Sequence, residues 1–127
     1  MSAFSDTPSL VASAPVTPFR FVKITGRNTG ANVGAITELA VGICDGSTSS
    51  FDQAVIVAGD TIPLQGGNVV LIESAGVIAA GAVVAPSANG RAQTAAATQF
   101  PYGVALEPAG AAGSIIRIYK QAGASVV

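Results

Sequence analysis

The sequence predicts an all-β protein, built as one small β-barrel domain of short strands with an extended N-terminal arm. Short runs of apolar and β-branched residues are separated by turn signals about every 8 to 12 residues, which is typical of barrels and sandwiches. The chain has 15 glycines and 7 prolines in 127 residues, and they interrupt nearly every stretch long enough for a helix. This length fits one domain with a core of its own.

Residues 1–18 predict an extended arm outside the domain. Three prolines and many Ser, Thr and Ala residues prevent a helix and favour an extended backbone. The segment is more apolar than a solvating tail requires, so we expect it to lie across a neighbouring molecule, although a disordered tail is the alternative. Its large apolar residues are Phe4, Leu10, Val11 and Val16.

The domain proper is expected to span residues 19–121 and to begin with a strand over residues 19–24. Side chains alternate along a strand, so Val22 and Ile24 share one face, and we expect that face to enter the core. The glycine- and asparagine-rich residues 26–34 predict an exposed, irregular loop.

Two runs in the middle of the chain are apolar at every position. Residues 54–58 read AVIVA and residues 69–72 read VVLI. A strand that is apolar on both faces is typically covered on both sides, so we expect each to contact the core on one face and a partner or loop on the other.

The C-terminal part predicts three more strands, over residues 83–85, 102–106 and 115–119. Asn89-Gly90 fits a type I′ hairpin turn, which needs positive φ at both positions. Residues 122–127 are expected to form a short tail. The order of strand, loop, short glycine-containing strand, turn and strand occurs in both halves, with Gly42 and Gly103 as anchors, which suggests a degenerate internal repeat.

Composition indicates a protein that works through contacts with other proteins. Hydrophobic residues make up 50% of the chain and charged residues only 10%, too few to cover a monomer's surface in a mixed pattern. Part of the surface is therefore expected to be covered by a partner. The net charge of −1 and six scattered Lys and Arg residues argue against nucleic acid. No signal peptide or membrane-spanning stretch is evident, so we expect synthesis in the cytosol and no membrane.

The residue set argues against an enzyme. The chain has no histidine, which excludes Ser-His-Asp and Cys-His units and removes the commonest metal ligand, so no cofactor or metal is expected. Cys44 lies in an apolar run and is expected to be a buried, inert thiol. A hydrolase using two carboxylates is the remaining enzymatic alternative, but we expect these carboxylates to be solvated turn residues. They are Asp45, Asp52, Asp60, Glu73 and Glu107.

Several motifs resemble the head-decoration, or capsid cement, proteins of tailed bacteriophages. That group shows an "I-x-x-G-x-x-V" and "N/D-G-R-A" middle and a "G-V-A-L-E, A-x-A-G, V/I-x-V" ending. The matching residues are Ile78, Gly81 and Val84, then 89–92, 103–107 and 113–118. The resemblance extends over about residues 15–120.

The resemblance implies a β-barrel or β-tulip-like domain that assembles as a homotrimer on the outer surface of the virion and binds the major capsid protein. On this basis we expect the arm residues Phe4, Leu10, Val11, Val16 and Phe19 to contact the capsid. We expect the two runs that are apolar on both faces, around residues 54–57 and 69–72, to form the trimer seam. The seam residues would be Val55, Val57, Val70 and Ile72. The competing function is a β-rich binding module, such as a phage fibre base or a host-surface adhesin.

Overall fold

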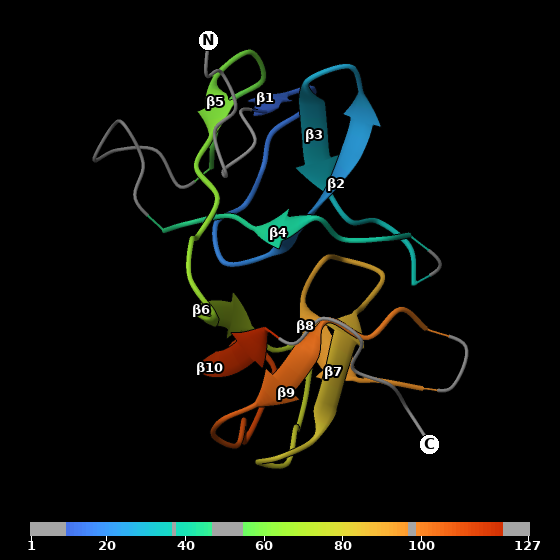
Figure 1. Ribbon diagram of the computed structural model, residues 1–127, viewed down its shortest axis with the longest axis vertical. Helices are drawn as coiled ribbons and strands as arrows, with labels where there is room; N and C mark the ends of the chain where they lie inside the picture. The colour runs from blue at the N-terminus through green and yellow to red at the C-terminus, as the bar shows by residue number, and fades with distance from the viewer. Residues whose placement is uncertain (1–9, 37, 47–54, 97–98, 121–127) are drawn as a thin grey trace, which may run out of the picture.

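The computed structural model describes residues 10–36, 38–46, 55–96 and 99–120, which form two five-stranded β-sheets (Figure 1). The first sheet comes from the N-terminal half of the chain and the second from the C-terminal half. Within these residues every regular element is a strand, and none is helical. The all-β fold of short strands is thereby confirmed.

The first sheet has the strand order β4-β2-β3-β1-β5. Its strands are β1 (Leu10–Ala12), β2 (Phe21–Gly26), β3 (Thr29–Asn32), β4 (Gly42–Ile43) and β5 (Thr61–Ile62). Strand β1 runs parallel to β3 and antiparallel to β5, so it lies inside the sheet.

The second sheet has the strand order β6-β10-β9-β7-β8, and all of its neighbouring strands are antiparallel. Its strands are β6 (Val69–Glu73), β7 (Val83–Pro86), β8 (Ala92–Thr94), β9 (Gly103–Ala105) and β10 (Ile115–Lys120). The predicted repeat is not reproduced in the topology, because Gly42 lies in an edge strand whereas Gly103 lies in a strand with neighbours on both sides.

The described part of the expected arm belongs to the domain. Leu10 is 3% exposed, and Val16 is fully buried and exchanges two backbone hydrogen bonds with Ile56, of 2.7 and 2.8 Å. Leu10 and Val16, which suggested a contact with a neighbour, instead cover the core of the first sheet, because that core would otherwise be open to water. Residues 1–9 lie outside the described residues.

The first strand and its loop differ from expectation. Phe21 and Val22 are both fully buried on opposite faces of β2, whereas Ile24 is 51% exposed. Phe21 packs into one hydrophobic cluster and Val22 into another, on the two faces of β2. The end of β2 around Ile24 extends beyond both clusters. The expected irregular loop contains β3, and Asn28, at φ 60°, makes the tight turn that joins β2 to it.

Two hydrophobic clusters hold the fold together. One joins the sheets, packing Phe21 and Val33 against residues of the second sheet such as Ile72 and Ile118. In this cluster the rings of Phe21 and Tyr102 pack edge to face, with their centroids 4.9 Å apart. The other cluster lies on the opposite side of the first sheet and contains Leu10, Ala12, Val16, Val22, Cys44, Ile56 and Ile62.

Two local predictions are wrong. The run around Ile56 is no regular strand: Ile56 makes a single bridge to Val16, and Val57 is 38% exposed. The β7–β8 turn is not type I′, because Gly90 has φ +80° while Asn89 does not have positive φ. Ser87 instead closes a longer loop, with its N–H donating to the Arg91 carbonyl at 2.7 Å.

Cys44 is buried, as expected, and its thiol donates to the Asp45 carbonyl at 3.4 Å. Burial, with the nearby Asp45 carboxylate, raises the pKa of the Cys44 thiol to about 11. We therefore expect no reaction with a thiol-specific disulfide reagent at pH 8 in the native state, and full reaction in denaturant. Rapid labelling of the native protein would contradict this.

Candidate interaction surfaces

The described part of the chain shows neither a candidate metal-binding cluster nor a candidate membrane-spanning helix. No group of three or more Cys, Asp and Glu side chains within that part of the chain could hold a metal ion. Nor does it contain a helix long and apolar enough to cross a membrane.

Glu73 is a junction between the two sheets rather than a solvated turn residue. Its carboxylate accepts a hydrogen bond from Arg20 Nε at 3.2 Å and forms an ion pair with Arg91 Nε at 3.0 Å. All three side chains are only 16% to 27% exposed. Because Arg20 precedes β2 and Arg91 precedes β8, the carboxylate ties the sheets together. Glu73 therefore has a structural role.

An apolar surface covers the outward face of the second sheet, and we call it the sheet-face patch. Its members are Val69, Leu71, Leu106, Ile115 and Tyr119, which are 39% to 51% exposed. Across β6, β10 and β9 they form rows, since Tyr119 lies between Val69 and the partly buried Val104, and Arg117 is paired with Leu71. Such a contiguous apolar patch is typical of a protein-binding surface.

Two of the four predicted seam residues are buried inside the fold and are not available to a partner. Val70 and Ile72 of β6 are 2% and 0% exposed, and both belong to the cluster that joins the sheets. Their neighbours Val69 and Leu71 point outward, because successive side chains alternate between faces. Val55 is partly buried and Val57 exposed, but they follow β4 in the first half of the chain and are not part of this patch.

The predicted capsid-contact residues are also dispersed. Leu10 and Val16 are buried, while Val11 is 38% exposed. Phe19 is half-buried and has φ 62°, and its carbonyl accepts the Glu73 N–H at 2.8 Å. Phe4 lies outside the described residues.

The free edge of β6 is closed by side-chain and main-chain groups, a feature that sequence reasoning missed. The Gln65 amide donates to the Leu71 carbonyl at 2.7 Å and accepts the Leu71 N–H at 2.8 Å, imitating a neighbouring strand. The Phe19 carbonyl accepts the hydrogen bond of the Glu73 N–H. Capping an edge in this way prevents another strand from pairing with it. Only a glutamine four residues before β6 signals it in the sequence.

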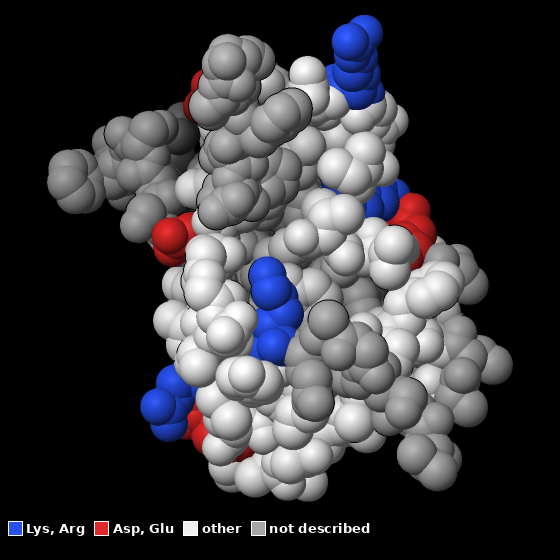
Figure 2. Space-filling model, in the orientation of Figure 1, with Lys and Arg blue, Asp and Glu red and all other residues white. Residues whose placement is uncertain are grey.

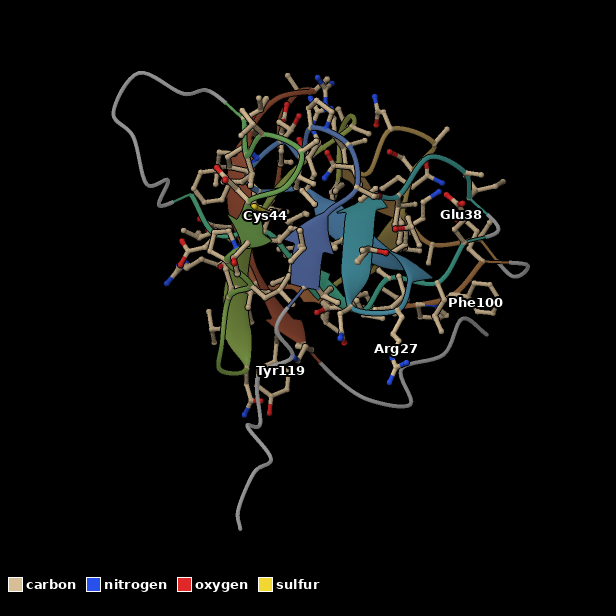
Figure 3. The ribbon with its side chains drawn as sticks, turned by 90° about the horizontal axis from the view of Figure 1, so that it is seen from above. Arg27, Glu38, Cys44, Phe100 and Tyr119 are labelled. Atoms are coloured by element: carbon tan, nitrogen blue, oxygen red, sulfur yellow. The ribbon has the colours of Figure 1, made fainter. Side chains whose placement is uncertain are left out.

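A shallow hollow of about 310 Å³ lies beside β2 in the first sheet. It is lined by Lys23, Ile24, Glu38, Leu39 and Val41, with an ion pair between Lys23 and Glu38 among three exposed apolar side chains. In Figure 3, Glu38 and Tyr119 lie on opposite sides of the molecule, so the hollow and the sheet-face patch face different ways.

Glu38 fixes the loop that forms one wall of the hollow. Its Oε1 accepts the N–H groups of Gly34 and Ala35 at 2.7 and 2.9 Å. The hydrogen bond from Lys23, followed by that from Gly34, lowers the pKa of the Glu38 carboxyl below its usual 4.5. The ionised form therefore stabilises the fold above the unfolded pKa, and this contribution is lost as pH falls through the lower folded pKa.

We expect the unfolding free energy to decline below about pH 4.5, and to decline less steeply in Glu38→Gln. Lys23→Met, which removes the largest cause of the lowered pKa, should act in the same direction. Urea unfolding at pH values from 3 to 7 measures both. An unchanged pH profile in both variants would show that this carboxylate does not contribute.

Charged groups are sparse on the visible face of the molecule, where they form a few separate spots on a largely uncharged surface (Figure 2). Beside the sheet-face patch, Glu107 accepts the Arg117 backbone N–H at 2.8 Å and its Nε at 3.1 Å. These two hydrogen bonds lower the pKa of the Glu107 carboxyl. Four of the six basic residues are ion-paired, namely Arg20, Lys23, Arg91 and Arg117.

Comparison with known proteins shows the family of the chain and the likeness of its fold. No curated protein matches the chain. Among solved structures, the crystal structure of the head fibre gp8.5 N base of bacteriophage phi29 is similar in fold, with a TM-score of 0.70 and 14% identity over 89% of this chain and 91% of that one. The family model described as phage cement protein matches residues 5–119. Since this match includes both sheets, the chain belongs to the phage cement protein family.

Proposed function

We propose that this chain binds the outer surface of a phage head as a trimer and holds neighbouring major capsid proteins together against the pressure of packaged DNA. The observation that carries the proposal is the family match over nearly the whole chain. The low charge and the exposed apolar surface support it, because both are expected of a chain that is covered by partners in its working state.

A cement protein needs contacts of two kinds, with its own copies and with the capsid. Two apolar surfaces on opposite sides of the described domain, the sheet-face patch and the hollow, support such a division. Bound to separate partners, they would not compete. Even micromolar contacts, worth about −8 kcal/mol each, combine into strong binding when several act on one rigid assembly.

The capsid contact is proposed to include residues 1–9 with Phe4, together with the exposed Val11 and half-buried Phe19. Removing residues 1–18 would not test this, because it would also remove β1 from the first sheet. Deleting residues 1–9 leaves the described domain whole. We expect this shorter chain to melt like the full chain but to bind heads at least tenfold more weakly; unchanged binding would exclude the arm.

The function is tested by co-sedimentation of the purified chain with heads of its parent phage that lack it, with the bound copies counted. Saturable binding in multiples of three per local symmetry site, and heads that then resist heat or osmotic shock, are the expected results. Absence of binding to such heads would reject the cement function.

The second candidate is a binding module such as a fibre base or a host-surface adhesin. The fold shared with the base of the phi29 head fibre favours it. An adhesin would increase adsorption of heads to host cells without changing their resistance to heat, whereas a cement protein would do the reverse. Measuring both quantities on the same saturated heads separates the two candidates.

A further inference from the structure

We infer that copies of this chain pack against one another through the sheet-face patch, the outward face of β6, β10 and β9, and not through the edge of β6. The inference rests on the proposed trimer and names the surface that forms it. Neighbouring copies would meet around Tyr119, Arg117 and Leu71.

The composition of the patch is that of an interface centre. Aliphatic side chains surround one tyrosine and one arginine, the residue types that are enriched where protein interfaces are most tightly packed. In one row across the sheet Arg117 lies between Leu71 and Leu106, and in the next Tyr119 lies between Val69 and Val104. No other part of the described second sheet presents so many large apolar side chains to solvent.

The size of the patch also suits an interface. Five side chains that are 39% to 51% exposed provide an apolar centre of roughly 300–400 Å². A stable interface takes about 800 Å² from each partner, of which a little over half is apolar. The patch therefore supplies most of the apolar area that one copy needs, and the polar groups around it can supply the rim.

The closed edge of β6 decides how a partner can approach. Gln65 and the Phe19 carbonyl already occupy the main-chain groups of Leu71 and the Glu73 N–H that a new strand would use. Pairing of β6 with another chain along Leu71 and Glu73 would have to break these three hydrogen bonds. Association by way of the face breaks none of them.

A second copy is the occupant that the charges favour. The patch carries one cation, Arg117, and one anion at its margin, Glu107, which neutralise each other at 3.1 Å. A surface bearing one charge of each sign is complementary to a copy of itself, because Arg117 of one molecule can pair with Glu107 of the next. Both side chains are more than a third exposed, so both are accessible to a neighbouring copy.

The test uses the full chain and three aspartate substitutions at exposed sites. Leu71→Asp lies in the patch, Leu39→Asp lies in the hollow, and Val77→Asp is a matched control at a 75% exposed residue outside both. We expect Leu71→Asp to reduce the mass in sedimentation from three copies to the 12.4 kDa monomer, while the other two variants stay assembled. All three should keep the wild-type circular dichroism spectrum.

The inference is overturned if Leu71→Asp assembles like the wild type, or if Leu39→Asp dissociates to the same extent. Should the wild type be monomeric in solution, the same question is answered on heads with Leu71→Cys, Val77→Cys and a short bismaleimide crosslinker. The native chain is a suitable background because Cys44 is buried. Covalent dimers from Leu71→Cys alone are the expected result.

Crosslinking of Leu71→Cys to the major capsid protein, or the absence of any product with head-bound protein, would overturn the inference in this second assay. These outcomes are separate from failure of the proposed function. Binding of wild-type protein to heads is measured first and without crosslinker, so a chain that cements through another surface would still bind.

Discussion

Replacing Gly103 with alanine is expected to be the most destabilising single-methyl change in the second sheet. A Cβ at this position would lie 2.3 Å from the carbonyl oxygen of Tyr119 and 3.2 Å from Cα of Lys120. These are backbone atoms of β10, to which β9 is hydrogen-bonded, so neither strand can move away without breaking the pairing. We expect a loss of about 3 kcal/mol or more in unfolding free energy, or failure to fold.

Gly110→Ala is the matched control for this prediction. Nothing lies within 4 Å of the position that the added methyl group would occupy, and the backbone of Gly110 is not in the left-handed region. The variant should therefore remain within about 0.5 kcal/mol of the wild type, or gain slightly from a less flexible unfolded chain. Urea denaturation measures both variants, and equal midpoints for Gly103→Ala and the wild type would contradict the close approach of β9 and β10.

Ile72→Ala and Leu71→Ala are expected to separate stability from assembly at two adjacent residues. Ile72 is fully buried between the sheets, so truncation should cost about 2–5 kcal/mol by loss of contacts and creation of a cavity. Leu71 is 39% exposed, so its truncation should cost less than about 1 kcal/mol in the monomer but weaken self-association.

The two effects must be measured under different conditions. Unfolding is followed at a protein concentration low enough that association does not add to the apparent stability, and association is followed by sedimentation over a range of concentrations. If Leu71→Ala were the more destabilising of the two in dilute solution, the assignment of the faces of β6 would be wrong.

The face of β6 is exposed whereas its edge is closed, and this difference has a physical reason. Assembly through side chains on a sheet face leaves the hydrogen bonds of the fold intact, whereas assembly through an edge competes with them. Gln65 uses both ends of its amide on Leu71, which closes the edge while the side chain of Leu71 stays exposed. If the chain acts in many copies on one head, as proposed, it gains from this arrangement, because open edges would promote uncontrolled aggregation.

Several features could be predicted from the sequence because they depend on neighbours in the chain. Turn residues at short intervals predicted many short strands, and the strands over residues 83–85 and 115–119 follow from β-branched runs between glycines. The burial of Cys44 follows from its apolar surroundings. The lack of histidine and the motifs of the second half of the chain pointed to a structural phage protein, and the family match confirms this class.

Other features depend on what lies across from a residue, and only the tertiary structure decided them. In β2 and β6 the alternation of side chains was predictable, but which alternate set is covered was not, because a run such as VVLI is equally apolar on both faces. Leu10 and Val16 read as an adhesive arm until β3, β5 and Ile56 are placed around them. Likewise Glu73 reads as a turn carboxylate until Arg20 and Arg91 are brought to it from distant parts of the chain. Local sequence determines where strands and turns form. Contacts between residues distant in the chain decide which side chains are buried and which strands pair. The candidate interaction surface consists of the apolar residues that those contacts leave uncovered.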